Sequence, residues 1–329
     1  MKDKEIEDLF IAFNNKKVLI VGDCMIDEYI WGEINRMSPE ASVPILDIKK
    51  KENRLGGAGN VARNIKSLGS IPILCSVIGD DEKGNELISL MKKNNLSTEG
   101  LFLSNERTTT IKTRIIANNK HQIRIDQEEI KNLSIEEKFL KKIDSLIQDI
   151  DVIILQDYNK GILTPKIIQS LINTGNKLQI PIIVDPKIKN FSLYKNCTIF
   201  KPNLKEIELG MNIKLDVNNQ NSLKVNTELL REKLNAKYVL LTLSDKGICI
   251  KSKEDFYYTP ASFKYDFLDV SGAGDTVLSV ASLIFDSNIN LKVLSQISSL
   301  AGGIVCQESG VVPIKKDKLL NEIKKNLNQ

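Results

Sequence analysis

The chain has 329 residues, of which 42% are hydrophobic and 27% charged, with 46 Lys and Arg against 42 Asp and Glu. This composition is typical of a globular protein with a large core, and the length predicts about two domains or one large α/β unit with an insertion. The net charge of +4 is spread along the chain, which argues against a nucleic-acid-binding surface. There is no secretory h-region and no apolar run of roughly 18–20 residues. We therefore expect a cytoplasmic protein that contacts neither nucleic acid nor membrane.

Scarce residue types narrow the chemistry. His121 is the single histidine, which excludes His-rich metal sites and H-E-x-x-H proteases. It lies in the polar stretch NNKHQ, and we expect a solvent-exposed turn residue there. The five cysteines have no C-x-x-C spacing, so neither a disulfide framework nor a zinc ribbon is expected. Catalysis would then depend on carboxylates, backbone amides and a bound cation that the protein takes up from solution.

Short β-branched runs alternate with segments of helical spacing. Strands are predicted at 17–21, 72–79, 151–157, 180–185, 197–203 and 238–244. Helices are predicted at 60–69, 86–95, 136–148, 165–176 and 227–235. This alternation predicts an α/β fold, a doubly wound and mostly parallel sheet with helices on both faces. We expect the Asn-rich segment 212–226 to be a mobile loop.

Two stretches, 25–49 and 108–127, alternate polar with apolar residues over strand lengths, without helical crossovers. This pattern indicates strands with one covered and one exposed face. The second stretch predicts a hairpin that turns at Asn118, Asn119 and Lys120. We expect the two stretches to form a small antiparallel sheet that stands off the main domain, as a lid over a site or as an oligomer interface.

The run DVSGAGDT, residues 269–276, precedes an apolar helical segment. Gly272, Ala273 and Gly274 would present free backbone N–H groups at the positive end of that helix, where an anion can bind. Asp275 would lie in the first turn with its pKa held low, ready to accept a proton. A base beside an anion hole is what phosphoryl transfer to a hydroxyl requires. An ordinary helix cap is the simpler alternative.

A glycine-rich run, RLGGAGNVARNIKSLG, occupies residues 54–69. Gly56 and Gly57 would allow close approach of the backbone to a ligand, and Asn60 offers an amide, although a plain helix N-terminus explains the run as well. A dinucleotide fingerprint needs G-x-G-x-x-G directly after a buried strand. Here the charged segment KKENR precedes the glycines, so an NAD-dependent oxidoreductase is not favoured.

Other polar groups follow predicted strands, at the sheet edge where ligands bind in open α/β folds. Asp23 and Asp27 could hydrogen-bond sugar hydroxyls or be turn aspartates. Asn203 and Glu206 could form a helix cap or orient a hydrated Mg²⁺ on ATP. The segment TLSDKG, residues 242–247, suits a nucleotide phosphate or ribose.

Together, these residues resemble the ribokinase-like, PfkB-type sugar kinases over essentially the whole chain, 1–329. The family's two signatures are a GG-rich stretch with an Asn and a D-[TV]-x-G-A-G-D run. They match Gly56–Gly69 and Asp269–Thr276 in order and spacing. The resemblance implies a kinase that uses ATP and Mg²⁺ on a small sugar. It also implies that 25–49 and 108–127 form a lid, which in the family often clasps a second subunit's lid in a homodimer.

The resemblance also implies roles for individual residues. Asp275 matches the catalytic base, and the anion hole matches Gly272, Ala273 and Gly274. The positions that hold the sugar match Asp27, Gly56, Gly57 and Asn60. The positions that line ATP and its Mg²⁺ match Asn203, Leu204, Lys205, Glu206, Thr242, Ser244 and Gly247. Asp269 and Ser271 match positions that in some members help to bind a monovalent cation such as K⁺.

A finer similarity connects the chain with D-glycero-D-manno-heptose 7-phosphate kinases of lipopolysaccharide-precursor synthesis, and the run SPEASVP at Ser38–Pro44 is its most diagnostic part. A substrate that already carries a phosphate needs fixed cations near the sugar. We expect these cations on one face of the lid and in the DYNKG loop, with a solvated lid face as the alternative. The residues concerned are Lys112, Arg114 and Arg124 on the lid, and Lys160 beside Asp157 in the loop.

Two departures from that pattern matter. Many such kinases carry a fused nucleotidyltransferase domain with an H-x-G-H motif, which this sequence lacks, so we expect the kinase activity alone. Ser299 stands where relatives often carry an Asn beside the adenine, which leaves that contact open. The hypothesis is phosphorylation of the anomeric hydroxyl of the heptose 7-phosphate. The alternatives are a PfkB-type kinase for fructose phosphate, ribose or a keto-sugar acid, and a non-catalytic sugar-binding or regulatory paralogue.

Overall fold

The structure, a computed structural model, describes residues 3–118, 120–261, 269–285 and 290–327. The strands are β1 (Lys17–Gly22), β2 (Cys24–Met37), β3 (Pro44–Gly57), β4 (Ile71–Gly79), β5 (Leu101–Ser104), β6 (Ile111–Ala117), β7 (Lys120–Gln127), β8 (Val152–Gln156), β9 (Ile182–Asp185), β10 (Ile199–Phe200), β11 (Tyr238–Thr242), β12 (Ile248–Lys251) and β13 (Phe256–Thr259). The α-helices are α1 (Asp3–Ala12), α2 (Ala58–Ser67), α3 (Glu82–Lys93), α4 (Glu136–Leu146), α5 (Pro165–Lys177), α6 (Leu204–Met211), α7 (Gln220–Leu234), α8 (Ala273–Ile284), α9 (Leu291–Val305) and α10 (Lys316–Leu327). Short 3₁₀ turns are η1 (Ile188–Asn190) and η2 (Ser244–Lys246).

The main sheet has the strand order β13-β12-β11-β10-β9-β8-β1-β4-β5 within the described residues. The strands from β11 to β5 run parallel, and β12 and β13 add an antiparallel edge. The predicted doubly wound, mostly parallel sheet is confirmed. Its carboxyl edge therefore gathers the residues that follow β1, β8, β9, β10 and β11, which positions the site.

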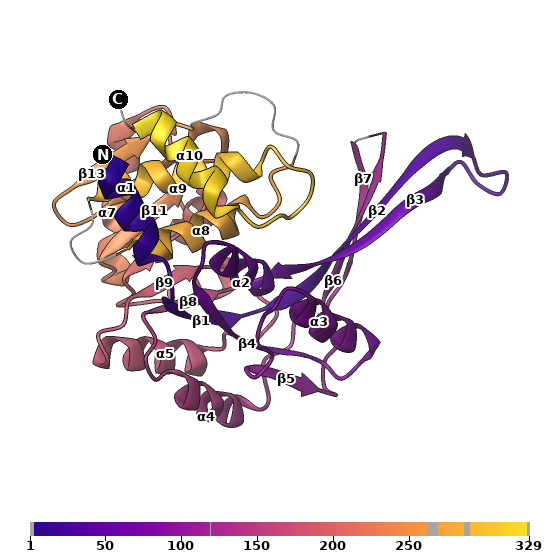
Figure 1. Ribbon diagram of the computed structural model, residues 1–329, viewed down its shortest axis with the longest axis horizontal. Helices are drawn as coiled ribbons and strands as arrows, with labels where there is room; N and C mark the ends of the chain where they lie inside the picture. Colours follow the sequence, from indigo (N-terminus) through magenta and orange to yellow (C-terminus); the bar gives the residue numbers. More distant parts are fainter. Residues whose placement is uncertain (1–2, 119, 262–268, 286–289, 328–329) are drawn as a thin grey trace.

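Helices cover both faces because the apolar side chains of the central strands alternate between two cores (Figure 1). On β1, Val18 and Ile20 pack with the core under α1, α2, α8, α9 and α10. Leu19 and Val21 of the same strand pack with the core under α4, α5 and α7. Burial on both faces explains the continuous apolar run of this strand, which a half-exposed strand would not need. Among the described helices, none is long and apolar enough to cross a bilayer.

The two stretches predicted to form a lid build a second sheet with the order β3-β2-β6-β7, which projects from the main body (Figure 1) and is called the lid below. The two hairpins, β2–β3 and β6–β7, are antiparallel, but β2 and β6 pair in parallel. The expected small antiparallel sheet is present, but its central pair, β2 with β6, is parallel. Both hairpins leave the main body at the same place, so their first strands run side by side in one direction. The expected turn falls between β6 and β7, although Asn119 lies outside the described residues.

Other boundaries also differ from expectation. Strand β3 continues past residue 49 to Gly57, so the glycine pair ends a lid strand. The expected loop at 212–226 is only partly a loop, because Asn219 caps α7 and residues 220–226 are helical. The polar side chains of this helix hid its narrow buried stripe, which begins with Leu223 and Thr227.

Candidate active site

Asp275 lies in the first turn of α8 and is almost fully buried, with 4% of its surface exposed. Three side chains donate hydrogen bonds to its carboxylate. Asn60 Nδ2 lies 2.8 Å from Oδ2, while Tyr158 OH lies 2.9 Å and Gln156 Nε2 3.1 Å from Oδ1. The donors come from α2 and from the carboxyl end of β8, so two distant segments meet on one carboxylate.

The expectation of a low pKa for Asp275 is wrong. Burial raises the pKa of this carboxyl from 3.8 to about 6, and the hydrogen bonds from Asn60 and Tyr158 only partly oppose this effect. Removal from water disfavours the charged form more strongly than the positive end of the helix favours it. A carboxylate with a pKa near 6 is still ionised at neutral pH, and it is a stronger base than an ordinary Asp.

The glycine motifs build the backbone around this carboxylate. Gly272 is the N-cap of α8 with φ 81°, a conformation that favours glycine. A Cβ at Gly272 would lie 3.0 Å from Asn60 Nδ2, so the two motifs are in contact. At the other motif, a Cβ on Gly56 would overlap the Asp27 carboxylate. Gly57 is the N-cap of α2, with φ 57°.

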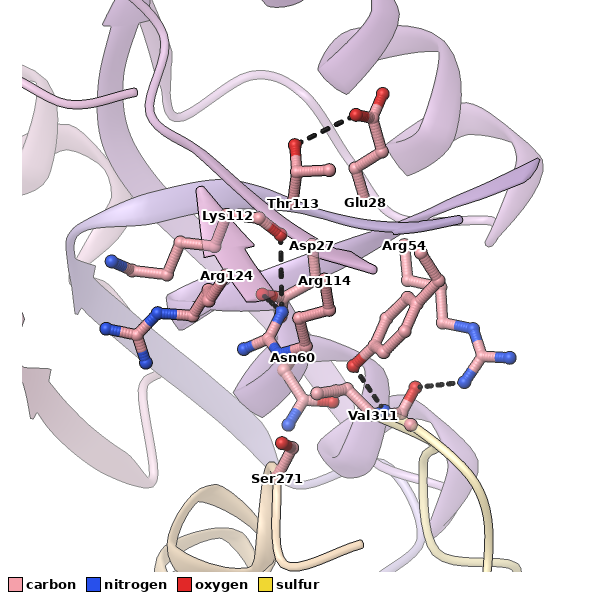
Figure 2. A network of polar contacts seen from close by, with 12 residues as sticks. Asp27, Glu28, Arg54, Asn60, Lys112, Thr113, Arg114, Arg124, Ser271 and Val311 are labelled. Atoms are coloured by element: carbon pink, nitrogen blue, oxygen red, sulfur yellow. Dashed lines mark hydrogen bonds and ion pairs between the residues drawn. The ribbon is translucent and has the colours of Figure 1, made fainter. Parts of the chain in front are cut away.

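One face of the lid, here called the inner lid face, carries Asp27, Tyr29, Lys112, Arg114 and Arg124. The register pairs Asp27 with Lys112 and Arg114 with Arg124. In Figure 2 the Asp27 and Arg114 side chains turn toward Asn60 and Ser271, while Glu28 and Thr113 lie on the opposite face. Arg114 Nη1 donates to Asp27 Oδ1 at 2.5 Å. Burial raises the pKa of Asp27, and Arg114 opposes this shift.

Three of the four predicted phosphate-binding cations are already paired with acids that the sequence reasoning did not consider. Lys112 Nζ lies 2.9 Å from Asp126 and 2.8 Å from Glu128. Lys160 Nζ lies 2.7 Å from Glu128, and Arg124 Nε lies 3.0 Å from Asp126. Three cations thus share two carboxylates, so the cluster keeps a positive excess that a phosphate could use.

The DYNKG loop is held by two aspartates, namely Asp23, which was considered as a sugar ligand or a turn aspartate, and Asp157, the neighbour of Lys160 in the loop. Asp23 accepts hydrogen bonds from the backbone N–H groups of Tyr158, Lys160 and Ile162. Asp157 is 1% exposed; its Oδ1 accepts from Asn159 N at 2.6 Å, and its Oδ2 accepts from Asn190 Nδ2 and Tyr194 OH. Both carboxylates therefore position backbone, and the structure does not bring them to the inner lid face.

A cavity of about 310 Å³ lies on the other side of the α8 N-terminus. Its lining joins four segments that the sequence connected with the nucleotide or the anion hole, and the residues are Asn203, Thr242, Ser244, Gly247, Ala273, Gly274 and Ser299. Leu204, Lys205 and Glu206 are absent from the described lining. A larger hollow of about 790 Å³, which includes Asn196 and Lys237, lies at the amino ends of β10 and β11, away from Asp275.

Glu206 caps α6 in a reciprocal arrangement. Its Oε2 accepts from Asn203 N at 2.9 Å, and Asn203 Oδ1 accepts from Glu206 N at 2.9 Å. Lys187 Nζ pairs with Glu206 Oε1. The helix cap considered above is therefore present, whereas orientation of a hydrated Mg²⁺ by these two residues stays a prediction.

Asp269 connects the anion-hole turn to the C-terminal part of the chain. Its Oδ1 accepts from Ser271 N at 2.8 Å, and its Oδ2 accepts from Gly310 N at 3.1 Å. His121 is a strand residue of β7, not the expected turn residue, and its Nε2 lies 3.5 Å from Asp269 Oδ2. The lid contacts the same region through Tyr29 OH, which accepts from Val311 N at 2.9 Å (Figure 2).

The sequence reasoning missed four side chains near Asp275. Gln156 and Tyr158 bond to it directly. Asp185, at the end of β9, accepts from Gln156 Nε2 at 3.2 Å and pairs with Lys201 Nζ at 3.1 Å. Asp185 ends one predicted strand and Gln156 is the last residue but one of another, so a systematic inspection of strand ends would have found them.

A buried carboxylate at a helix N-terminus beside a cavity, on a doubly wound sheet with a small projecting sheet, fits a phosphotransferase that acts on an alcohol group. The chain belongs to the pfkB family of carbohydrate kinases, whose family model matches residues 15–317.

Curated relatives agree with this assignment. The chain is 40% identical over 298 residues to the bifunctional protein HldE of Helicobacter acinonychis, which covers 90% of this chain and 64% of that protein. It is 35% identical over 325 residues to the bifunctional protein HldE of Geotalea uraniireducens, covering 98% of this chain and 66% of that protein. The chain thus spans slightly less than two thirds of the length of these relatives.

Among solved structures, phosphofructokinase-2 from Escherichia coli in complex with potassium superposes with a TM-score of 0.78. The sequence identity is 19%, and the alignment covers 96% of this chain and all of the other. This likeness confirms the ribokinase-like fold.

Proposed function

We propose that the protein transfers the γ-phosphoryl group of ATP to the anomeric hydroxyl of D-glycero-D-manno-heptose 7-phosphate and so forms the 1,7-bisphosphate. The observation that carries this proposal is Asp275, a buried carboxylate with three side-chain donors at the positive end of α8. The cavity at Gly274 would hold the nucleotide, and the inner lid face would hold the sugar.

The chemistry follows from this arrangement. Asp27 and Asn60 would orient the sugar, and Asp275 would accept the hydroxyl proton as the oxygen attacks the γ-phosphorus in line with the ADP leaving group. One O–P bond forms and one breaks, and the proton leaves Asp275 with the products. The backbone amides of Gly272–Gly274 would stabilise the charge on the transferred group. The lid would exclude water and limit ATP hydrolysis.

The heptose phosphate is favoured over other sugars by three observations. The run SPEASVP lies at the β2–β3 turn, where Ser38 N donates to Val43 O at 2.8 Å. The curated relatives carry the name bifunctional protein HldE, and the sequence resembles heptose 7-phosphate kinases. The positive excess of Lys112, Arg124 and Lys160 is suited to a phosphate already on the sugar.

The residues present also fit the expected cations. Among the described residues, no three carboxylate, thiol or imidazole ligands come together, so a metal here would depend on phosphate oxygens and water. Such coordination is typical of Mg²⁺, which neutralises charge on the phosphates of ATP. Glu206 uses one oxygen in the cap and the other in its pair with Lys187, but a carboxylate has further lone pairs that can hold a water of hydrated Mg²⁺. Asp269, with two backbone donors, is the proposed side-chain ligand of a monovalent cation, together with Ser271.

We further propose a homodimer through the outer lid face, defined here as Ile30, Ile115, Ile123 and Ile125 with the polar Glu28 and Thr113. The register places these side chains opposite the inner lid face. Ile123 and Ile125 are 55% and 50% exposed in the single chain. Adjacent exposed isoleucines on a projecting sheet favour burial against an identical surface.

An ADP-release assay against a panel of sugars and sugar phosphates tests the substrate. We expect turnover on the heptose 7-phosphate at a kcat/KM at least tenfold above that on fructose phosphate, ribose or a keto-sugar acid. Turnover on ribose with none on the heptose phosphate would overturn the substrate assignment. Absence of turnover on every sugar, with sugar binding retained, would instead support a regulatory paralogue.

A further inference from the structure

Lys201 is a buried lysine beside the anion hole that the chemistry above does not use. It immediately follows β10, and only 3% of its side chain is exposed. Its Nζ lies 3.1 Å from Asp185 Oδ2. A Cβ built on Gly274 would lie 3.7 Å from the same nitrogen, so the ammonium group lies against the backbone of the proposed anion hole.

A second observation is the position of Lys201 relative to the cavity and to Asp275. Gly274 lines the 310 Å³ cavity on one side, and Asp275, the next residue, faces Asn60 and Tyr158 on the other. Lys201 lies against Gly274 and is therefore close to the boundary between the cavity and the base. A phosphoryl group that moves from a nucleotide in the cavity to a hydroxyl at Asp275 must cross this boundary.

The polar contacts of Lys201 extend to the base itself. Gln156 Nε2 donates to Asp185 Oδ2 at 3.2 Å and to Asp275 Oδ1 at 3.1 Å. Asp185 therefore holds both the ammonium group of Lys201 and the amide that touches Asp275. The charge of Lys201 also lowers the pKa of Asp275, against the larger effect of burial.

Stability alone is a weak reason for such a pair. The free-energy cost of removing two charges from water is about as large as the gain from their attraction. A buried ion pair therefore often stabilises a fold no more than apolar residues of the same volume. Positive groups fixed in a water-excluded site are, however, the usual means of stabilising the charge on a transferring phosphoryl group. The described structure places such a group within reach of the helix amides.

We propose that Lys201 is a catalytic residue that contacts the γ-phosphoryl group, and that Asp185 is a positioning residue that holds its ammonium. The proposal rests on the proposed phosphoryl transfer and adds a residue to it. In the ground state Lys201 donates to a γ-phosphate oxygen, and it keeps this contact as the O–P bond to ADP breaks and the bond to the sugar oxygen forms. It neither gains nor loses a proton.

The test compares Lys201→Met with Lys251→Met. Lys251 is a matched control, because its side chain is 5% exposed and its Nζ lies 3.0 Å from Glu228 at the far end of β12. ATP and ADP affinities are measured by calorimetry with Mg²⁺ present, and kcat is measured with saturating sugar. We expect Lys201→Met to bind ATP at least tenfold more weakly with unchanged ADP affinity, and to lose about 10²–10³-fold in kcat. Lys251→Met should change neither the ATP-to-ADP affinity ratio nor kcat.

Equal weakening of ATP and ADP, or a kcat within threefold of the parent, would overturn the role of Lys201. If Lys201→Met does not fold, the double variant Lys201→Met/Asp185→Asn removes both charges and allows the same ATP-to-ADP comparison. Lys201→Arg should recover part of kcat, since it restores the cation. Absence of turnover in the parent protein would count against the proposed function, whereas the ATP-to-ADP affinity ratio still tests Lys201.

Discussion

Asn60 and Asp275, separated by 215 positions in the sequence, meet through a hydrogen bond of 2.8 Å from Nδ2 to Oδ2. The contact joins the start of α2, directly after the lid strand β3, to the start of α8. The residue proposed to orient the sugar is thus in contact with the base. Any shift of the β3–α2 junction would change the geometry of the base.

The pH dependence of the reaction follows from the raised pKa of Asp275. Only the ionised carboxylate accepts a proton, so kcat/KM should fall about tenfold per pH unit below about pH 6 and level off above it. Tyr158→Phe removes a hydrogen bond that lowers this pKa, so the acidic limb should move to higher pH. A pH–rate profile of both proteins checks this. An unchanged limb would show that Tyr158 does not act on the base.

The free energy of unfolding should also depend on the protonation of Asp275. Because the folded-state pKa of Asp275 is raised, its neutral form is favoured in the fold, and the stability that this contributes is lost as pH rises through about 6. Ionisation should cost about 3 kcal/mol at pH 8, the free energy of a shift of about two units. Asp275→Asn should therefore raise the free energy of unfolding more at pH 8 than at pH 5. Urea titrations at both values measure the difference, and an equal effect at the two pH values would contradict the burial argument.

Lys160 should contribute to binding the phosphate already on the sugar. Lys160→Met should raise the KM for the heptose 7-phosphate roughly 10–100-fold, the range for a lost charge-assisted hydrogen bond, and should leave the KM for ATP unchanged. Lys166→Met is the control, because Lys166 on α5 forms an exposed pair with Glu137 on α4. Steady-state kinetics, with each substrate varied in turn, measure both KM values. A parallel rise in both KM values would point to general damage.

The outer lid face should control the oligomeric state. Ile125→Lys places a charge in the proposed interface and should shift the protein from dimer to monomer in sedimentation experiments. Ile130→Lys is a matched control, since Ile130 is 59% exposed but lies beyond β7. A monomeric parent protein, or a dimer that survives Ile125→Lys, would refute an interface through these residues.

Much of the fold was predictable because the local patterns agree with the tertiary structure. The buried strands β1, β8 and β9 are short β-branched runs, and the amphipathic helices α4 and α5 between β7 and β9 show clear spacing. The start of α7 was not predictable, since its polar residues cover a narrow buried stripe. The parallel pairing of β2 with β6 depends on where the two hairpins leave the body, which no local pattern shows.

The candidate site was predictable at its two glycine motifs and less so around them. Gly272 and Asn60, one from each motif, lie next to each other in the structure. The pKa of Asp275 was not predictable, because it depends on burial by segments distant in sequence. Asp157 ends a strand as a ligand residue would, yet Asn190 and Tyr194 turn its carboxylate away. Lys201 looks like any lysine in the sequence, and only its pairing with Asp185 distinguishes it.

The central claim is that Asp275 is the base of a sugar-phosphate kinase. The most direct test measures ADP release and, by ³¹P NMR, product formation from heptose 7-phosphate with ATP and Mg²⁺, for the parent protein, Asp275→Asn and Asp144→Asn. Asp144 is exposed on α4 and is the matched control. We predict one new anomeric phosphoester per ADP for the parent and the control, and a kcat about 10²–10⁴-fold lower for Asp275→Asn at unchanged ATP affinity. An Asp275→Asn protein with a kcat within threefold of the parent would show that Asp275 is not the base.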